Sequence, residues 1–144
     1  MNKEKPTYLA SPYTHPDMVV MQKRYKKALA AAAELTNLGR VVYSPIVHCH
    51  EMARYHKMPT TWEFWERFDR VMLSVCGSMA VLMLDGWRES VGVTAEIKLA
   101  KEMGLPICYL MRAGHKGPAR DDMAKAHHHI ERALEVLNEE RPKQ

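Results

Sequence analysis

Short apolar runs and longer segments of helical spacing alternate along this chain. The apolar runs predict strands at residues 8–10, 41–43, 80–84 and 106–110. Apolar positions spaced three to four residues apart predict helices at residues 18–38, 62–75 and 90–103, with a final helix at about 119–139. Residues 48–59 hold too many polar and aromatic side chains for a plain connector, so we expect an irregular active-site loop there, which could contain a short helix.

Nearly all-apolar strands that alternate with helices are typical of a parallel sheet buried on both faces. We therefore predict one doubly wound α/β domain, Rossmann- or flavodoxin-like, with about four to five parallel strands and helices on both faces. The chain of 144 residues has the size of one domain, which we assign to residues 1–144 with a core at 7–112. Ligands bind such sheets beyond the carboxyl ends of the strands, which places residues 11–14, 44–50 and 85–96 around one crevice.

The amino-acid composition of the chain limits the classes of function that we expect for it. Apolar residues make up 47% of the chain, enough for a core, and no segment resembles a membrane helix or the apolar part of a signal peptide. We expect a cytoplasmic protein with no membrane partner. The net charge of +4 is spread along the chain, and the densest basic run, residues 23–27, is interpreted as a solvated helix face, so no nucleic-acid polymer is expected as ligand. The three cysteines form no CxxC pair and are expected to be reduced thiols.

Reactive groups gather where the third predicted strand meets the helix that follows it. Glu96 lies near the start of that helix, where the positive end of the helix dipole favours an ionised carboxylate that can act as a nucleophile. Gly92 lets a ligand approach the backbone closely, and Ser90 with the free amides of the helix start could hold an anion such as phosphate. The alternative is that Glu96 is an ordinary surface residue of the kind favoured near helix starts.

Five segments together resemble a known superfamily. They are Tyr8-Leu9-Ala10-Ser11-Pro12-Tyr13, Ser44-Pro45-Ile46, Trp62-x-x-Trp65 leading to Asp69, Asp85-Gly86-Trp87, and Ser90-Val91-Gly92-Val93-Thr94-Ala95-Glu96. In these segments the chain resembles the nucleoside 2-deoxyribosyltransferase-like superfamily, and within it a bacterial and phage branch. That superfamily contains deoxyribosyltransferases, 2'-deoxynucleoside 5'-monophosphate N-glycosidases and related nucleotide hydrolases. The resemblance covers residues 7–112 and leaves the last predicted helix unmatched.

The resemblance implies three catalytic roles. Glu96 matches the glutamate that attacks the anomeric carbon, Asp69 the aspartate that assists at the base or the sugar, and Tyr8 the tyrosine that places the nucleophile. The reaction implied is a two-step displacement in which the base departs, a covalent glycosyl-enzyme forms on Glu96, and water or a second base resolves it. Such a reaction needs no metal or redox cofactor.

The resemblance also bears on the substrate. Ser90 matches the residue that holds the 5' side of the sugar, which is a serine in the monophosphate hydrolases and an acidic residue in the transferases that use free nucleosides. A hydroxyl can donate to phosphate, so Ser90 favours a 5'-monophosphate, with Ser11 as a second donor. The hydrolases also use an arginine in the first loop, and this loop has none. His15 or Arg24 could substitute, or the substrate could lack phosphate.

Further side chains near the crevice are assigned to substrate binding. Tyr13 lies in the first loop, and a group at the carboxyl end of the third strand consists of Asp85, Gly86 and Trp87. His48 and His50 alternate in a segment expected to be extended, so their side chains would point the same way. Metal binding, contact with a base or sugar, and a structural role all remain open for this pair.

These observations lead us to expect an N-glycosidase that hydrolyses a nucleoside 5'-monophosphate, with deoxyribose as the expected sugar. A deoxyribosyltransferase that exchanges bases is one alternative, and a non-catalytic nucleotide sensor is another. The expected partner is a small nucleoside or nucleotide. Because members of the superfamily often complete the site with a neighbouring subunit, a homodimer or homotetramer is expected.

Overall fold

The structure of the protein is a computed structural model, and it describes residues 4–111. The elements in chain order are β1 (Thr7–Ala10), α1 (Met18–Asn37), β2 (Val42–Tyr43), α2 (Pro45–Tyr55), α3 (Trp62–Val75), β3 (Ser78–Met83), α4 (Val91–Glu102) and β4 (Ile107–Met111). The predicted strands and three of the predicted helices are confirmed to within a few residues at each end. The helix expected at 119–139 lies outside the described residues.

The strands form one parallel sheet in the order β2-β1-β3-β4. β1 and β3 lie side by side in the middle, paired from Thr7↔Ser78 to Ala10↔Val81. From β1 the chain leads to one edge strand, and from β3 it leads to the other. The carboxyl ends of these two strands therefore form the topological switch point at which α/β sheets bind ligands.

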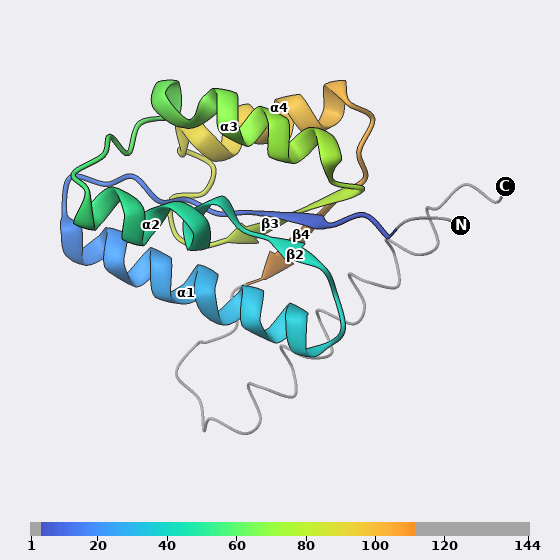
Figure 1. The fold of residues 1–144 in the computed structure, drawn as a ribbon, viewed down its shortest axis with the longest axis horizontal. Coiled ribbons are helices and arrows are strands. Elements are labelled where there is room, and N and C mark those ends of the chain that lie inside the picture. The colour runs from blue at the N-terminus through green and yellow to red at the C-terminus, as the bar shows by residue number, and fades with distance from the viewer. Residues whose placement is uncertain (1–3, 112–144) are drawn as a thin grey trace, which may run out of the picture.

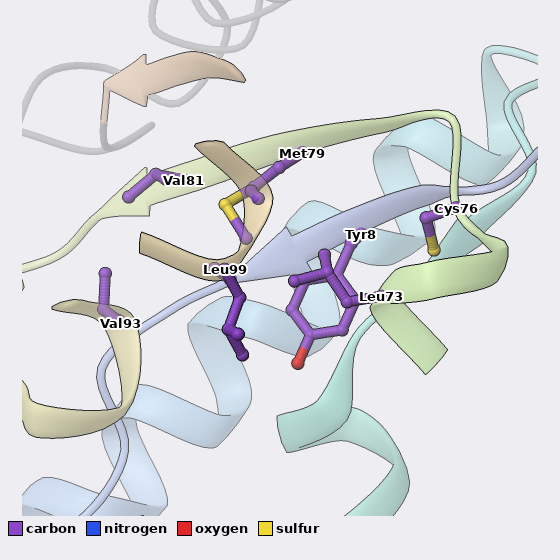
Figure 2. Close-up of a cluster of buried hydrophobic side chains, with 9 residues drawn as sticks. Tyr8, Leu73, Cys76, Met79, Val81, Val93 and Leu99 are labelled. Atoms are coloured by element: carbon purple, nitrogen blue, oxygen red, sulfur yellow. The ribbon is translucent and has the colours of Figure 1, made fainter. Parts of the chain in front are cut away.

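Helices cover both faces of the sheet (Figure 1), as the sequence predicts. Alternate residues of a strand point to opposite faces. On one face Tyr8, Met79 and Val81 pack with α3 and α4, and Figure 2 shows this cluster with Leu73 and Leu99. On the other face the strand residues pack with α1, which adds the buried Leu35. No helix among residues 4–111 is long and apolar enough to cross a bilayer.

Most of the segment 48–59 is helical, so the short helix expected there is confirmed and the irregular loop is wrong except for the residues after Tyr55. α2 begins at Pro45 and continues to Tyr55. Ser44 caps its first turn, since its hydroxyl oxygen accepts a hydrogen bond from the backbone N–H of Val47 at 3.2 Å. Proline is favoured in the first turn of a helix because it has no N–H to leave unpaired. Ser44-Pro45 is thus a helix start that directly follows β2, without an intervening loop.

Candidate active site

A pocket of about 330 Å³ opens at the carboxyl ends of β1 and β3. Its walls come from the β1–α1 loop, the first turns of α2, the segment before α3, α3 itself and the start of α4. Six residues that the sequence analysis singled out line it together: Ser11, Tyr13, Asp69, Ser90, Gly92 and Glu96. Segments as far apart in sequence as 11 and 96 therefore meet at the switch point, as expected.

Glu96 is buried in this pocket and does not face solvent, since only 5% of it is exposed. Its Oε1 accepts a hydrogen bond from the hydroxyl of Tyr8 at 3.1 Å, and its Oε2 is buried with no hydrogen-bond partner among the described residues. The interpretation of Glu96 as an ordinary surface residue is therefore wrong. A buried carboxylate oxygen without a partner is costly, so its presence calls for a functional explanation.

Burial raises the pKa of Glu96 well above its usual range. The nearby charge of Asp69 raises it further, and the hydrogen bond from Tyr8 acts in the opposite direction. Burial thus opposes the ionisation that the helix dipole was expected to favour at Glu96. The dipole acts mainly within the first turn, whereas Glu96 lies beyond the first turn of α4.

Asp69 extends from α3 into the same pocket and is 6% exposed. Burial raises the pKa of its carboxyl from 3.8 to about 7. A group with a pKa near 7 can both give and accept a proton at neutral pH, which is the requirement for a general acid and base. The pocket therefore holds two buried carboxyl groups whose charges interact, one of which titrates near neutrality.

Two tyrosines lie behind the carboxyl pair. Tyr8 is fully buried in the cluster of Figure 2, and burial together with the charge of Glu96 raises its pKa, so its hydroxyl stays protonated and donates to Glu96. The ring of Tyr43 lies 5.7 Å from that of Tyr8, and its hydroxyl is buried without a described partner. Burial and then the charge of Asp69 raise the pKa of Tyr43, which places this phenol near the acid pair. The sequence analysis missed Tyr43, although its place at the carboxyl end of β2 was a usable signal.

The same pocket carries the residues expected to hold the 5' side of a sugar. Ser90 caps α4, and its Oγ accepts a hydrogen bond from the backbone N–H of Val93 at 3.2 Å, which leaves its own proton free to donate. Ser11 lines the same pocket, and its buried hydroxyl has no described partner. Two carboxyl groups, those of Glu63 and Glu89, also line this pocket.

His48 and His50 do not line this pocket, and their side chains do not point the same way. Residues two apart diverge around a helix, and both lie on α2. His50 is buried behind Tyr13, with Nδ1 2.6 Å from the Tyr13 hydroxyl and Nε2 2.9 Å from Oε1 of Gln22. His48 stacks on Phe68, with ring centroids 5.0 Å apart. Among residues 4–111, no group of three His, Cys, Asp or Glu side chains is placed to hold a metal ion.

The residues after β3 also lie apart from the pocket lining. The backbone carbonyl of Asp85 accepts a hydrogen bond from Arg24 at 3.1 Å. Trp87 packs near the ring of Tyr109 at 5.6 Å and below the guanidinium of Arg88 at 4.8 Å. In this structure Asp85, Gly86 and Trp87 support the loop that leads to Ser90, and they are not among the pocket-lining residues.

Comparison with family models gives one match, which covers residues 5–112 and is described as a domain of unknown function, DUF1937. The chain belongs to the DUF1937 family. The DUF1937 domain therefore contains all four strands and the whole described pocket. No curated protein matches the chain.

The pocket of the DUF1937 domain also has lining residues on α2 and around the start of α3. Cys49, Thr60 and Thr61 were not expected in the site, whereas Trp62 and Trp65 belong to one of the segments that carry the superfamily resemblance. Trp65 is held by a hydrogen bond from its indole N–H to the carbonyl of Pro59 at 2.8 Å. The two tryptophans give the pocket aromatic surface beside the acid pair, an arrangement suited to a planar ligand.

Proposed function

We propose that the protein is an N-glycosidase that hydrolyses a nucleoside 5'-monophosphate, with deoxyribose as the expected sugar, through a covalent intermediate on Glu96. The observation that carries the proposal is the buried Oε2 of Glu96, which has no hydrogen-bond partner among residues 4–111 and shares a pocket with Asp69. The resemblance to the nucleoside 2-deoxyribosyltransferase-like superfamily supports it, because these two residues match the nucleophile and the assisting aspartate. As the sequence suggests, we place the activity in the cytoplasm.

Each carboxyl group has a distinct task in this reaction. Glu96 attacks the anomeric carbon as the bond to the base breaks, and the base leaves with the bonding electrons and a proton from Asp69. Water then attacks the same carbon and gives a proton to the Asp69 carboxylate. The sugar leaves Glu96 and both carboxyl groups return to their starting states. The pKa of about 7 at Asp69 suits both proton transfers.

The reaction requires Asp69 to hold a proton while Glu96 is ionised. The two groups interact, so a proton on Asp69 removes the charge that contributes to the raised pKa of Glu96. The hydrogen bond from Tyr8 favours the ionised form of Glu96. We infer that the hydrogen bond from Tyr8 favours the state in which Glu96 is ionised and Asp69 holds the proton. Asp69 then acts as the acid and Glu96 as the nucleophile.

The 5' side of the substrate would face Ser11 and Ser90. The hydroxyl of Ser11 is buried without a described partner, and the first amides of α4 have no acceptor within the helix. Both features suit a phosphate. Glu63 and Glu89 favour a second candidate, a free nucleoside, because carboxylates in the pocket lining repel a phosphate dianion.

The decisive experiment incubates the purified protein with a panel of nucleosides and 5'-monophosphates and measures released base. Glu96→Gln, which keeps the shape of the side chain, is expected to abolish release of base. Glu102→Gln, an exposed residue at the end of the same helix, is the matched control and should leave release unchanged. Intact mass measurement of wild-type protein with substrate should detect the glycosyl ester, and its loss in Glu96→Gln locates the ester.

The same assay separates the alternatives. Added acceptor base that yields a new nucleoside or nucleotide identifies a transferase, and free sugar or sugar phosphate identifies a hydrolase. Binding of a nucleotide without turnover, unchanged by Glu96→Gln, identifies a sensor. Turnover that survives in Glu96→Gln at the wild-type rate contradicts the proposal.

A further inference from the structure

Arg24 joins the two loops that leave the central strands. It lies on α1, and its Nη1 donates to the backbone carbonyl of Thr14 at 3.1 Å and to that of Tyr13 at 3.4 Å. Its Nη2 donates to the carbonyl of Asp85 at 3.1 Å. One guanidinium therefore contacts the β1–α1 loop and the β3–α4 loop at the same time.

Gly86 leaves room for this guanidinium. A Cβ at position 86 would lie 2.8 Å from Nη2 of Arg24, closer than real contacts allow. Gly86 also has a φ of +83°, a conformation that side chains disfavour. Gly39 has almost the same φ, +82°, but a Cβ there would meet nothing within 4 Å. A comparison of alanine at position 86 with alanine at position 39 therefore separates the effect of backbone conformation from the effect of contact with Arg24.

Both loops carry residues of the candidate active site. Ser11, Tyr13 and Thr14 belong to the first loop, and Glu89 and Ser90 to the second, and all five line the pocket. The ladder between β1 and β3 ends at Ala10↔Val81, and β3 remains paired with β4 as far as Met83↔Met111, so no strand pairing joins the β1–α1 loop to the β3–α4 loop. Contacts between the loops, such as those of Arg24, therefore contribute to the distance between the two walls.

We propose that Arg24 is a positioning residue for the proposed reaction, which sets the spacing of the two walls through the carbonyls of Tyr13, Thr14 and Asp85. The guanidinium is a planar fork of donors whose directions are fixed, so it can contact carbonyls of two loops at once. A lysine ammonium is a single point of charge at the end of a flexible chain and cannot reproduce the fork. The inference rests on the proposed function for its catalytic part only.

The role assigned to Arg24 also bears on the substrate. With its guanidinium committed to these carbonyls, Arg24 does not take the place of the arginine that the superfamily's monophosphate hydrolases carry in the first loop. Nδ1 of His15 accepts a hydrogen bond from the backbone N–H of Asp17 at 2.9 Å. Neither Arg24 nor His15 lines the candidate active-site pocket.

One test does not depend on activity and uses Cys49 as a reporter. Cys49 lines the pocket, is buried, and lies near enough to Tyr13 to affect the titration of that phenol. We expect Arg24→Lys and Gly86→Ala each to raise the rate of Cys49 alkylation by iodoacetamide about tenfold, a shift large enough to measure by peptide mass spectrometry. The buried Cys76 and Cys108 are internal controls, and Gly39→Ala is the matched variant expected to leave Cys49 unchanged. An unchanged rate at Cys49, or an equal rise at all three cysteines, overturns the proposal.

The catalytic part is tested by release of base under conditions where each variant remains folded. A displacement of about 1 Å at catalytic groups costs on the order of a hundredfold in rate. We expect kcat/KM to fall by about that factor in Arg24→Lys and in Arg24→Ala, and millimolar guanidinium ion to restore part of it in Arg24→Ala only. Faster alkylation of Cys49 with full turnover shows that Arg24 holds the wall without positioning the reaction, which refutes the proposal. If the wild-type protein releases no base from any substrate, the proposed function and the catalytic part fail together, and the alkylation result alone decides whether Arg24 holds the pocket wall.

Discussion

Asp69→Asn should stabilise the fold at neutral and alkaline pH while it abolishes activity. In the folded protein the pKa of Asp69 is raised from 3.8 to about 7 by burial. A carboxyl whose pKa is higher in the folded than in the unfolded chain takes up a proton on folding between those two values. Its contribution to stability is therefore present at low pH, falls as the pH rises from about 4 to about 7, and is lost above that range.

The size of the stability change in Asp69→Asn follows from the pKa shift of Asp69. Each pH unit of pKa difference corresponds to about 1.4 kcal/mol, so ionised Asp69 destabilises the folded state by about 4 kcal/mol at pH 8 relative to a protonated carboxyl. Asparagine cannot ionise and removes this cost, but its amide, if left unpaired, costs about 1–2 kcal/mol. We expect a net gain of about 2–3 kcal/mol at pH 8, or roughly 10 °C in Tm for a domain of this size.

The assay is urea unfolding of wild type and Asp69→Asn at several values between pH 5 and pH 8. The wild-type free energy of unfolding should fall between pH 5 and pH 8. The fall in Asp69→Asn over the same range should be smaller by about 3 kcal/mol. Glu102→Gln, an exposed substitution, should follow the wild type within about 0.5 kcal/mol. Parallel pH curves for wild type and Asp69→Asn, with the variant less stable at pH 8, would refute a raised pKa at this residue.

Two further predictions concern the groups around the carboxyl pair. Tyr8→Phe removes the hydrogen bond that lowers the pKa of Glu96, so the acid limb of the kcat/KM profile should move to higher pH; an unmoved limb contradicts the role assigned to Tyr8. Ser90→Asp keeps a residue that can cap α4 but adds a negative charge. Turnover of 5'-monophosphates should then fall at least tenfold while turnover of free nucleosides is retained, and an equal loss on both classes argues against Ser90 at the 5' position.

Much of the fold could be predicted from local pattern. Apolar runs bounded by turn residues predict all four strands, because strands buried on both faces carry few polar side chains. The parallel sheet and the convergence of residues 11 and 96 at one edge follow from the order of elements alone. α2 could not be recognised in this way. Its start at Ser44-Pro45 uses the same residues that end strands, and only the hydrogen bond from the N–H of Val47 to Ser44 distinguishes the two.

The sequence by itself determined which carboxyl groups to consider, since Asp69 and Glu96 stand in segments that resemble a known superfamily. Only the tertiary structure decided their electrostatics. Desolvation depends on what surrounds a group in three dimensions, and at Glu96 burial is the largest cause of the raised pKa. The placement of His50 behind Tyr13 and the three carbonyls that Arg24 contacts also depend on segments distant in the chain. The order of elements sets where the pocket lies, and long-range packing sets which side chains face it and in which protonation state.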